Sequence, residues 1–223
     1  MKLDEYPEKT AEILNTCKQY SLLSEERLRA NIAAVRYVNR EGIAGDIVEI
    51  GVWKGGSMLA MMLTNEESPS SRLFHLYDTF VGMTEPSDTD ADFNGISAEL
   101  MMLHNPGFRC ISSLEEVKEN ISRHTGIVPQ YHEGDILLNT FVPKKIAVLR
   151  LDTDWYESTK HELDTFYDSV VPGGIIIIDD YGHWKGCKKA VDEFLGVHPE
   201  IVLQTIDYTG RWFLKPLAST SVV

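Results

Sequence analysis

Two apolar segments that each end in aspartates constrain this chain most strongly. The first, Ile146–Leu151, is followed by Asp152 and Asp154, and the second, residues 175–178, is four isoleucines followed by Asp179-Asp180. A helical pattern separates them, so we expect two parallel, adjacent strands of one sheet. Their aspartates then emerge together at the carboxyl edge, where open α/β sheets bind ligands.

Several carboxylates at one edge need a counter-ion, because neighbouring like charges raise one another's pKa. The nearby ligand atoms are oxygens, with His183 as the one nitrogen donor and no adjacent cysteine. This set favours Mg²⁺ (or Mn²⁺) over zinc. The alternative is that the aspartates cap the following helices. Capping explains Asp154 equally well, but it explains Asp179-Asp180 poorly.

Length, charge and cysteine content narrow the class of protein. The 223 residues, 43% of them hydrophobic, predict a single domain: N-terminal helices at 1–44, an α/β core at 45–215 and a tail at 216–223. A net charge of −13 disfavours nucleic acid as a partner and favours cations. Three cysteines without a close pair predict free thiols, and no signal or membrane-span pattern is present, so we expect a cytoplasmic protein without a membrane partner.

Helical spacing predicts two N-terminal helices, over residues 7–20 and 24–40, with Ser24 as an N-cap followed by acidic residues. They form a helical cover that packs on the sheet edge, shields the site or builds a homo-oligomer interface. The sequence does not choose among these roles.

A strand, a glycine-rich turn and a helix start follow one another at residues 46–63. Such an opening is typical of nucleotide binding. The turn, residues 51–57, departs from G-x-G-x-x-G because Trp53 stands where the second glycine approaches a pyrophosphate. We therefore expect a nucleoside ligand without a pyrophosphate. The alternative is a tight turn with no ligand.

The next two predicted strands also end in polar residues at this edge. Residues 73–77 lead into Asp78, placed to bind a ribose diol, and residues 131–133 lead into Gly134-Asp135, placed beside an adenine. A turn cap is the alternative for Asp78. Residues 84–94, with Asp88, Asp90 and Asp92, lack periodicity and predict an acidic loop that acts as a lid or is simply solvated.

The remaining pattern completes the fold class. We expect helices over 114–124, 156–170 and 185–195, a turn at 172–174, and strands at 201–206 and 212–214 joined as a hairpin. The prediction is an α/β, Rossmann-like, doubly wound and mainly parallel sheet with a C-terminal antiparallel hairpin and an N-terminal helical cover.

Four motifs in order, at residues 48–57, 77–82, 149–159 and 178–182, resemble those of the macrocin O-methyltransferase family. This resemblance covers roughly residues 46–194. It implies an enzyme that depends on S-adenosylmethionine (SAM) and a divalent metal, and that methylates a sugar hydroxyl. The acceptor sugar is expected to be a rhamnose-like deoxysugar in a glycan or a glycosylated natural product.

The resemblance also implies the site residues. Asp152, Asp179 and Asp180 hold the metal. The cofactor lies over the glycine-rich turn, with its ribose on Asp78 and its adenine near Gly134-Asp135. The full set of implied cofactor residues is Glu49, Gly51, Trp53, Gly55, Ser57, Asp78, Thr79, Phe80, Gly134, Asp135, Ile136 and Asp152. Catechol-type enzymes carry a lysine shortly after the first metal aspartate, where this chain has Trp155 and Tyr156.

For the chemistry, we expect Asp152 both to bind the metal and to receive the proton, with His183 or Asp154 as the next candidates for the base. A surface or capping role is the alternative for His183. Tyr181 and Trp184 are candidates for an apolar wall beside a sugar, or for core packing.

Three other functions are consistent with parts of this pattern. A nicotinamide-dependent dehydrogenase needs the missing glycine fingerprint and has no use for Asp179-Asp180. A catechol-type O-methyltransferase and a non-catalytic module that binds a nucleoside and a metal are the remaining alternatives.

Overall fold

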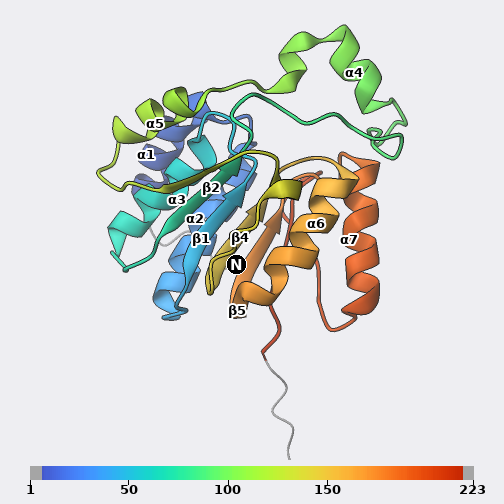
Figure 1. Ribbon diagram of the computed structural model, residues 1–223. Helices are drawn as coiled ribbons and strands as arrows, with labels where there is room; N and C mark the ends of the chain where they lie inside the picture. Colours follow the sequence, from blue (N-terminus) through green and yellow to red (C-terminus); the bar gives the residue numbers. More distant parts are fainter. Residues whose placement is uncertain (1–6, 218–223) are drawn as a thin grey trace, which may run out of the picture.

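A computed structural model describes residues 7–217. Its centre is a seven-stranded sheet in the order β3-β2-β1-β4-β5-β7-β6 (Figure 1). The strands are β1 (Asp46–Ile50), β2 (Phe74–Asp78), β3 (Gln130–Glu133), β4 (Ile146–Leu151), β5 (Val170–Ile178), β6 (Gln204–Thr205) and β7 (Arg211–Leu214). The first five are parallel, and β7 runs antiparallel to both β5 and β6. The predicted fold class is confirmed.

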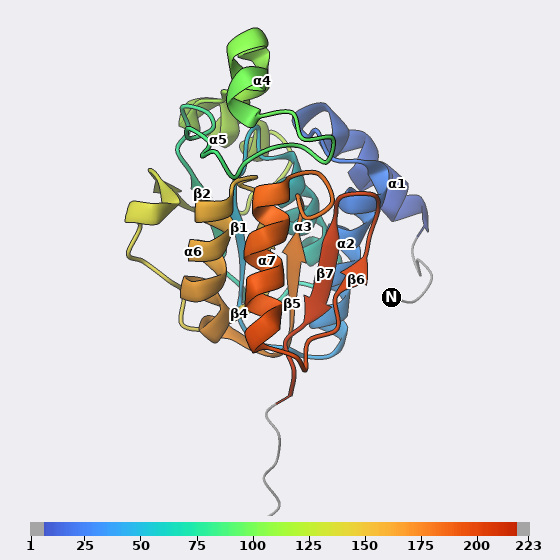
Figure 2. The ribbon, with the colours of Figure 1, turned by 90° about the vertical axis from the view of Figure 1, so that its right-hand side faces the viewer.

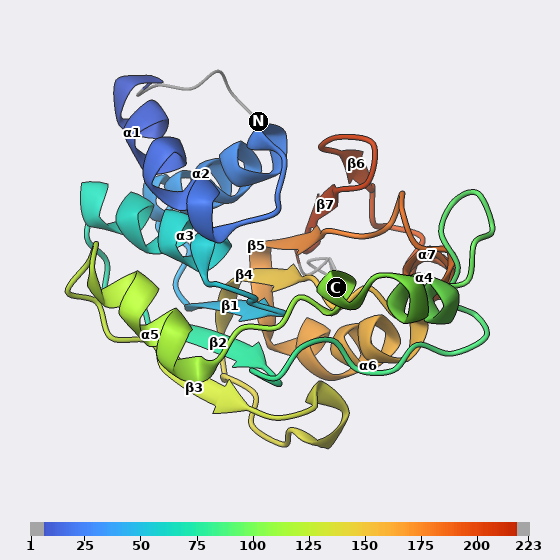
Figure 3. The same cartoon turned by 90° about the horizontal axis from the view of Figure 1, so that it is seen from above.

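Helices cover both faces of the sheet (Figures 1, 2 and 3). One face packs against α2 (Glu25–Arg40), α3 (Gly56–Glu67) and α5 (Leu114–Ser122), with α1 (Pro7–Cys17) outside α2 and α3. The other face packs against α6 (Tyr156–Phe166) and α7 (Lys185–Val197). Because both faces are covered, the central strands are mainly apolar on both faces rather than alternating, with Glu49 in β1 and Arg150 in β4 as exceptions.

The helix starts follow from the sequence. Ser24 accepts a hydrogen bond from the Arg27 N–H (3.2 Å) and caps α2, as predicted. Ser113 accepts one from the Glu116 N–H (3.2 Å) and caps α5, where the sequence offered Ser112 or Ser113. All three cysteines are free thiols, also as predicted.

Strand β5 begins earlier than predicted. The sequence indicated a turn at Pro172-Gly173-Gly174, but these residues lie inside the strand. The pairing with β4 jumps from Ile146↔Val170 to Val148↔Ile175, so they form a bulge. A bulge accepts a proline, which cannot donate to the ladder, and Gly173 takes the positive φ of 80°.

Other boundaries also differ. The helix predicted over 156–170 stops at Phe166 and continues as a 3₁₀ turn, Tyr167–Ser169, while β6 is only two residues long. Helix α4 (Ala98–His104) was not predicted; it stands above the carboxyl edge of the sheet (Figures 1 and 2). Within residues 7–217, no helix combines the length and apolar character that a membrane crossing requires.

Candidate active site

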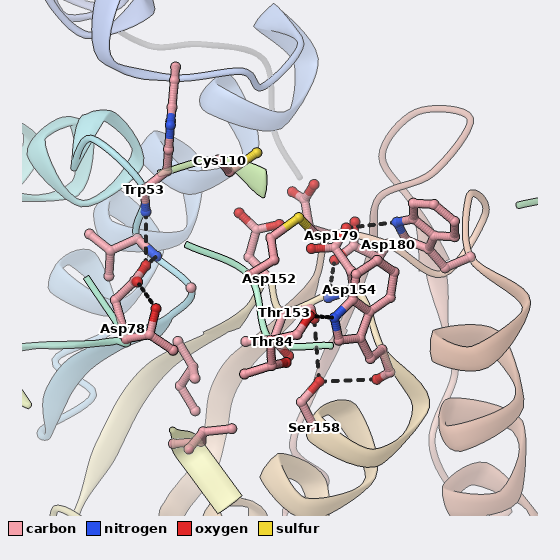
Figure 4. Close-up of a pocket in the computed structure, with 18 of the residues that line it drawn as sticks. Trp53, Asp78, Thr84, Cys110, Asp152, Thr153, Asp154, Ser158, Asp179 and Asp180 are labelled. Atoms are coloured by element: carbon pink, nitrogen blue, oxygen red, sulfur yellow. Dashed lines mark hydrogen bonds between the residues drawn. The ribbon is translucent and has the colours of Figure 1, made fainter. Parts of the chain in front are cut away.

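A pocket of about 590 Å³ lies at the carboxyl edge of the sheet, where the ends of β1, β2, β4 and β5 meet (Figure 4). Its wall is completed by the N-terminal cover, through residues 20–23 and Arg27, and by the loops after β2, β3 and β5. Of the three roles left open for the N-terminal helices, shielding the site is therefore supported by the structure.

Close approach of two strand ends sets the shape of the pocket floor. Gly51 has a φ of 83°, and a Cβ atom there would lie 1.9 Å from the carbonyl oxygen of Asp152. Only glycine permits this contact between the end of β1 and the end of β4. The turn thus brings the predicted cofactor loop directly against Asp152, the first of the predicted metal ligands.

Asp78 holds the glycine-rich turn in place. Its carboxylate accepts hydrogen bonds from the N–H groups of Val52 (2.7 Å), Trp53 (3.0 Å) and Phe80 (2.8 Å), the first two from the turn itself (Figure 4). Asp78 also lines the pocket, as its predicted contact with a ribose requires. That contact stays a prediction, and the hydrogen bonds to the turn support the turn cap that the sequence offered as the alternative role.

Most of the other predicted cofactor residues also line the pocket. They are Glu49, Gly51, Trp53, Ser57, Thr79, Gly134, Asp135, Ile136 and Asp152. Gly55 and Phe80 lie behind the wall: Gly55 starts α3 with a φ of 86° beneath Val117 and Ile121, and Phe80 is buried in the core. Both residues support the turn rather than face the cavity.

One group of carboxylates in the described part of the chain is close enough to share a metal ion. Asp152, from the end of β4, meets Asp179 and Asp180, from the end of β5, with one oxygen of each lying within 4.8 Å of the others (Figure 4). All three donors are hard oxygen ligands, which fits Mg²⁺ or Mn²⁺. The predicted convergence of the two strand ends is confirmed.

Arg150 is the main feature of this site that the sequence interpretation missed. Its guanidinium is fully buried in β4, where it donates to Glu49 (2.9 Å), Asp152 (2.7 Å) and Asp179. It therefore links a predicted cofactor-binding carboxylate to two predicted metal ligands. The available signal was an arginine inside an otherwise apolar strand, a position where a charge must be paired.

Burial raises the pKa of several carboxyl groups around Arg150. Desolvation is the largest cause in each case, and it raises the pKa of Glu49 to about 7, of Asp179 to about 6 and of Asp154 to about 8. The charge of Asp152 acts in the same direction on all three, while Arg150 opposes the shift at Glu49 and Asp179. Such a site is short of positive charge, and a cation would favour the ionised carboxylates.

Asp154 does not cap the following helix. The Tyr156 N–H at the start of α6 donates a hydrogen bond to Asp90 (2.8 Å). The Asp154 carboxylate instead accepts a hydrogen bond from the indole N–H of Trp184 (2.7 Å). Asp154 has a φ of 69°, and its own N–H donates to Asp180 (3.2 Å). The capping interpretation is therefore wrong for this residue, whose side chain lines the pocket.

The acidic loop at 84–94 is more tightly bound than predicted. Asp90 and Asp92 are buried: Asp90 accepts from Ser87 and Tyr156, and Asp92 accepts from the Ile96 N–H (2.7 Å). A simple solvated loop is therefore wrong for these two residues, although Asp88 is exposed. The loop lines the pocket, in the position that a lid would take.

His183 and the aromatic residues separate into two groups. His183 is half-buried at the pocket, with Nδ1 3.3 Å from the Tyr208 hydroxyl, and burial lowers its pKa, which favours a neutral ring. Trp184 also lines the pocket. Tyr181 does not line it: its hydroxyl donates to Asp192 (2.8 Å), so the expected wall contains Trp184 without Tyr181.

Comparison with known proteins identifies the family. The family described as "Macrocin-O-methyltransferase (TylF)" matches residues 14–215. The chain belongs to the macrocin O-methyltransferase family. It is thus an O-methyltransferase that depends on SAM, and the resemblance inferred from its four motifs is confirmed.

Individual known proteins are similar to this chain over most of their length. A Streptomyces olivaceus enzyme, 8-demethyl-8-(2,3-dimethoxy-alpha-L-rhamnosyl)-tetracenomycin-C 4'-O-methyltransferase, is 30% identical over 90% of this chain and 77% of its own. Mycinamicin III 3''-O-methyltransferase of Micromonospora griseorubida is 31% identical over 88% and 78%. The solved O-methyltransferase NovP is 29% identical, covers 89% of this chain and 83% of its own, and superposes with a TM-score of 0.77.

Proposed function

We propose that this enzyme transfers the methyl group of SAM to a hydroxyl of a rhamnose-like deoxysugar, carried by a glycosylated natural product or a glycan, with the help of a divalent metal. The carboxylate group at Asp152, Asp179 and Asp180, beside the cofactor loop, carries the proposal. The relatives that are 30% and 31% identical to this chain are named for methylation of a rhamnosyl-tetracenomycin and of mycinamicin III, which supports the acceptor class.

In this proposal, the metal and the cofactor lie on opposite sides of the contact between Gly51 and Asp152. SAM would lie over the turn at residues 51–57, which ends at the N-terminus of α3. The metal would be held by the three aspartates, and Gly51 brings the turn against the backbone of Asp152. When bound, a divalent cation orients two neighbouring hydroxyls and lowers the pKa of one of them.

Two carboxylates compete for the role of proton acceptor. Asp152, our expectation from the sequence, accepts a hydrogen bond from Arg150 at Oδ2 and is one of the three aspartates proposed to bind the metal, which leaves it little capacity for a proton. Asp154 lines the same pocket but is not one of the three proposed metal ligands, and one of its oxygens accepts a hydrogen bond from the Trp184 indole. This geometry favours Asp154 as the acceptor, with Asp152 as a ligand and His183 as the remaining candidate.

Mass spectrometry tests the proposed reaction. The metal-free protein is incubated with SAM, Mg²⁺ and a panel of rhamnosides, with catechol as the competing acceptor. The expected result is a rhamnoside heavier by one methyl group, formed only with Mg²⁺ and lost with EDTA. Methylation of catechol alone supports the catechol-type alternative, and methylation unaffected by EDTA rules out the metal. Binding of SAM with transfer to neither acceptor would contradict the proposed acceptor class.

The two acceptor candidates can be separated by conservative substitutions. Asp152→Asn should weaken metal binding and activity together. Asp154→Asn should leave metal binding within about threefold of wild type while lowering kcat by about 10²–10⁴-fold, the usual contribution of a general base. SAM affinity, measured by calorimetry, should survive in both variants. An active Asp154→Asn enzyme would remove Asp154 from the role of base.

A further inference from the structure

Arg27 brings a positive charge from the N-terminal cover to the cluster formed by Asp152, Asp179 and Asp180. It lies in the first turn of α2, and only 14% of its side chain is exposed. Its Nη1 donates to Asp179 Oδ2, and its Nε donates to Asp207 Oδ2 (3.1 Å) in the loop between β6 and β7. The residues it joins are 152 and 180 positions away along the chain.

The Asp179 carboxylate is consequently occupied on both oxygens. Arg150 donates to Oδ1 and Arg27 donates to Oδ2, and the Asp179 side chain is only 3% exposed. The two arginines differ in how firmly they are held. Arg150 is fully buried in β4 among three carboxylates, whereas Arg27 reaches in from a peripheral helix and has a second anchor outside the metal group.

We propose that Arg27 is a resident counter-ion of the metal-free site, and that a divalent cation displaces its Nη1 from Asp179. This inference rests on the proposed function, because it assumes that Asp152, Asp179 and Asp180 bind the metal. Two cations that share one buried carboxylate repel each other strongly in a weakly screened environment. The guanidinium therefore stabilises the empty site and opposes loading of the metal.

The second anchor makes this displacement a small movement. Asp207 is fixed by the N–H groups of Thr209 (3.0 Å) and Gly210 (2.7 Å) and by the Ser24 hydroxyl (2.7 Å). Nε of Arg27 can stay on Asp207 while Nη1 leaves Asp179. The released Nη1 then remains at the wall of the pocket as a donor for an acceptor oxygen, so metal loading prepares the acceptor side of the site.

Metal affinity tests the inference directly. Mn²⁺ is titrated into metal-free protein, and free Mn²⁺ is followed by electron paramagnetic resonance. Arg27→Gln keeps a donor to Asp179 but removes the charge, so Mn²⁺ should bind at least about tenfold more tightly than to wild type. Arg27→Lys retains the charge and should bind Mn²⁺ within about threefold of wild type, like the control Arg29→Gln on the outer side of the same helix.

The outcomes separate this inference from the proposed function. Asp180→Asn should abolish binding and so locate the Mn²⁺ site. If wild type binds Mn²⁺ there and Arg27→Gln binds it equally or more weakly, the counter-ion inference is overturned while the metal site stands. If neither wild type nor Arg27→Gln binds Mn²⁺, the metal site itself fails, and the inference with it.

A measurement on the wild-type chain covers the case in which Arg27→Gln folds poorly. In ¹⁵N side-chain spectra, the Arg27 Nε–H signal, assigned by its loss in Arg27→Lys, should shift when Mg²⁺ is added. The Arg29 signal should stay in place. A merely structural Arg27 predicts no Mg²⁺-dependent shift, and that result would overturn the inference.

Discussion

Residues with positive φ gather around the pocket. Trp53 (46°), Cys110 (49°) and Asp154 (69°) all line it, although none is a glycine. Each such conformation costs about 1–3 kcal/mol and persists only where the surroundings enforce it. The enforcing bonds are visible at two of them: Asp78 holds the Trp53 N–H, and Asp180 holds the Asp154 N–H. The predicted cofactor turn and the segment that follows β4 are thus built on constrained backbone.

Gly51 is the residue at which this constraint is tested most simply. Gly51→Ala places a Cβ atom 1.9 Å from the Asp152 carbonyl oxygen at a positive φ, so the strand ends must separate. We expect a loss of more than about 2 kcal/mol in the free energy of unfolding and a loss of SAM binding. The control, Gly126→Ala, adds a Cβ with nothing within 4 Å and should change both by little. Normal SAM binding by Gly51→Ala would contradict this interpretation.

At the scale of elements, the loop at 84–94 ties together the two helices on one face of the sheet. Asp90 Oδ1 accepts a hydrogen bond from the Tyr156 N–H at the start of α6. The same oxygen lies close to Gly186 of α7, where an added Cβ atom would be only 1.9 Å from it. The Trp155 indole N–H donates to the Thr84 carbonyl (3.0 Å). The rim of the pocket is therefore held to the start of α6 by hydrogen bonds and packs closely against the start of α7.

Asp90→Ala should remove the hydrogen bond that holds the loop at 84–94 against the start of α6. It removes the acceptor for the Tyr156 N–H and for Ser87, which predicts a loss of about 1–2 kcal/mol in the free energy of unfolding. The KM for the acceptor should rise because the pocket rim loosens. Asp88→Ala, in the same loop but exposed, is the matched control and should be near wild type in urea unfolding and in kinetics. Equal behaviour of the two variants would argue against the bracing role.

The same elements show which parts of the structure were predictable. The bounds of β4 follow from six consecutive residues that are apolar except for Arg150 and are all buried. Such a run can be recognised from the neighbouring residues in the sequence alone. Helix α4 has no comparable signal because Leu100 and Leu103 are exposed. The convergence of Asp152, Asp179 and Asp180 follows from the parallel order of β4 and β5. Arg27 could not be foreseen, because its pairing with Asp179 depends on how α2 packs against the finished sheet.

At the scale of the whole molecule, buried groups with opposite pKa shifts control how stability depends on pH. Burial, with a contribution from His75, lowers the pKa of His132 to about 4, and the two imidazoles meet at 3.0 Å. Between pH about 6.5 and 4, the unfolded chain binds a proton at His132 that the folded chain does not, so acid destabilises the fold. Raised pKa values, as at Asp154 and Asp179, act in the opposite direction.

The contribution of His132 can be isolated by difference. Between pH 7 and pH 5, the wild type should lose about 1 kcal/mol more in the free energy of unfolding than His132→Gln, measured in urea without metal. The control His104→Gln removes an exposed imidazole and should follow the wild type. Parallel pH profiles for wild type and His132→Gln would show that the contact between His75 and His132 contributes nothing to the pH dependence.

The central claim is that the ends of β4 and β5 present their carboxylates to one divalent cation beside the SAM loop. The most direct measurement is anomalous diffraction at the manganese edge from crystals grown with Mn²⁺ and SAM. The account predicts a single strong peak coordinated by Asp152, Asp179 and Asp180, next to cofactor density over residues 51–57. Cofactor density with no manganese peak among these aspartates would contradict it.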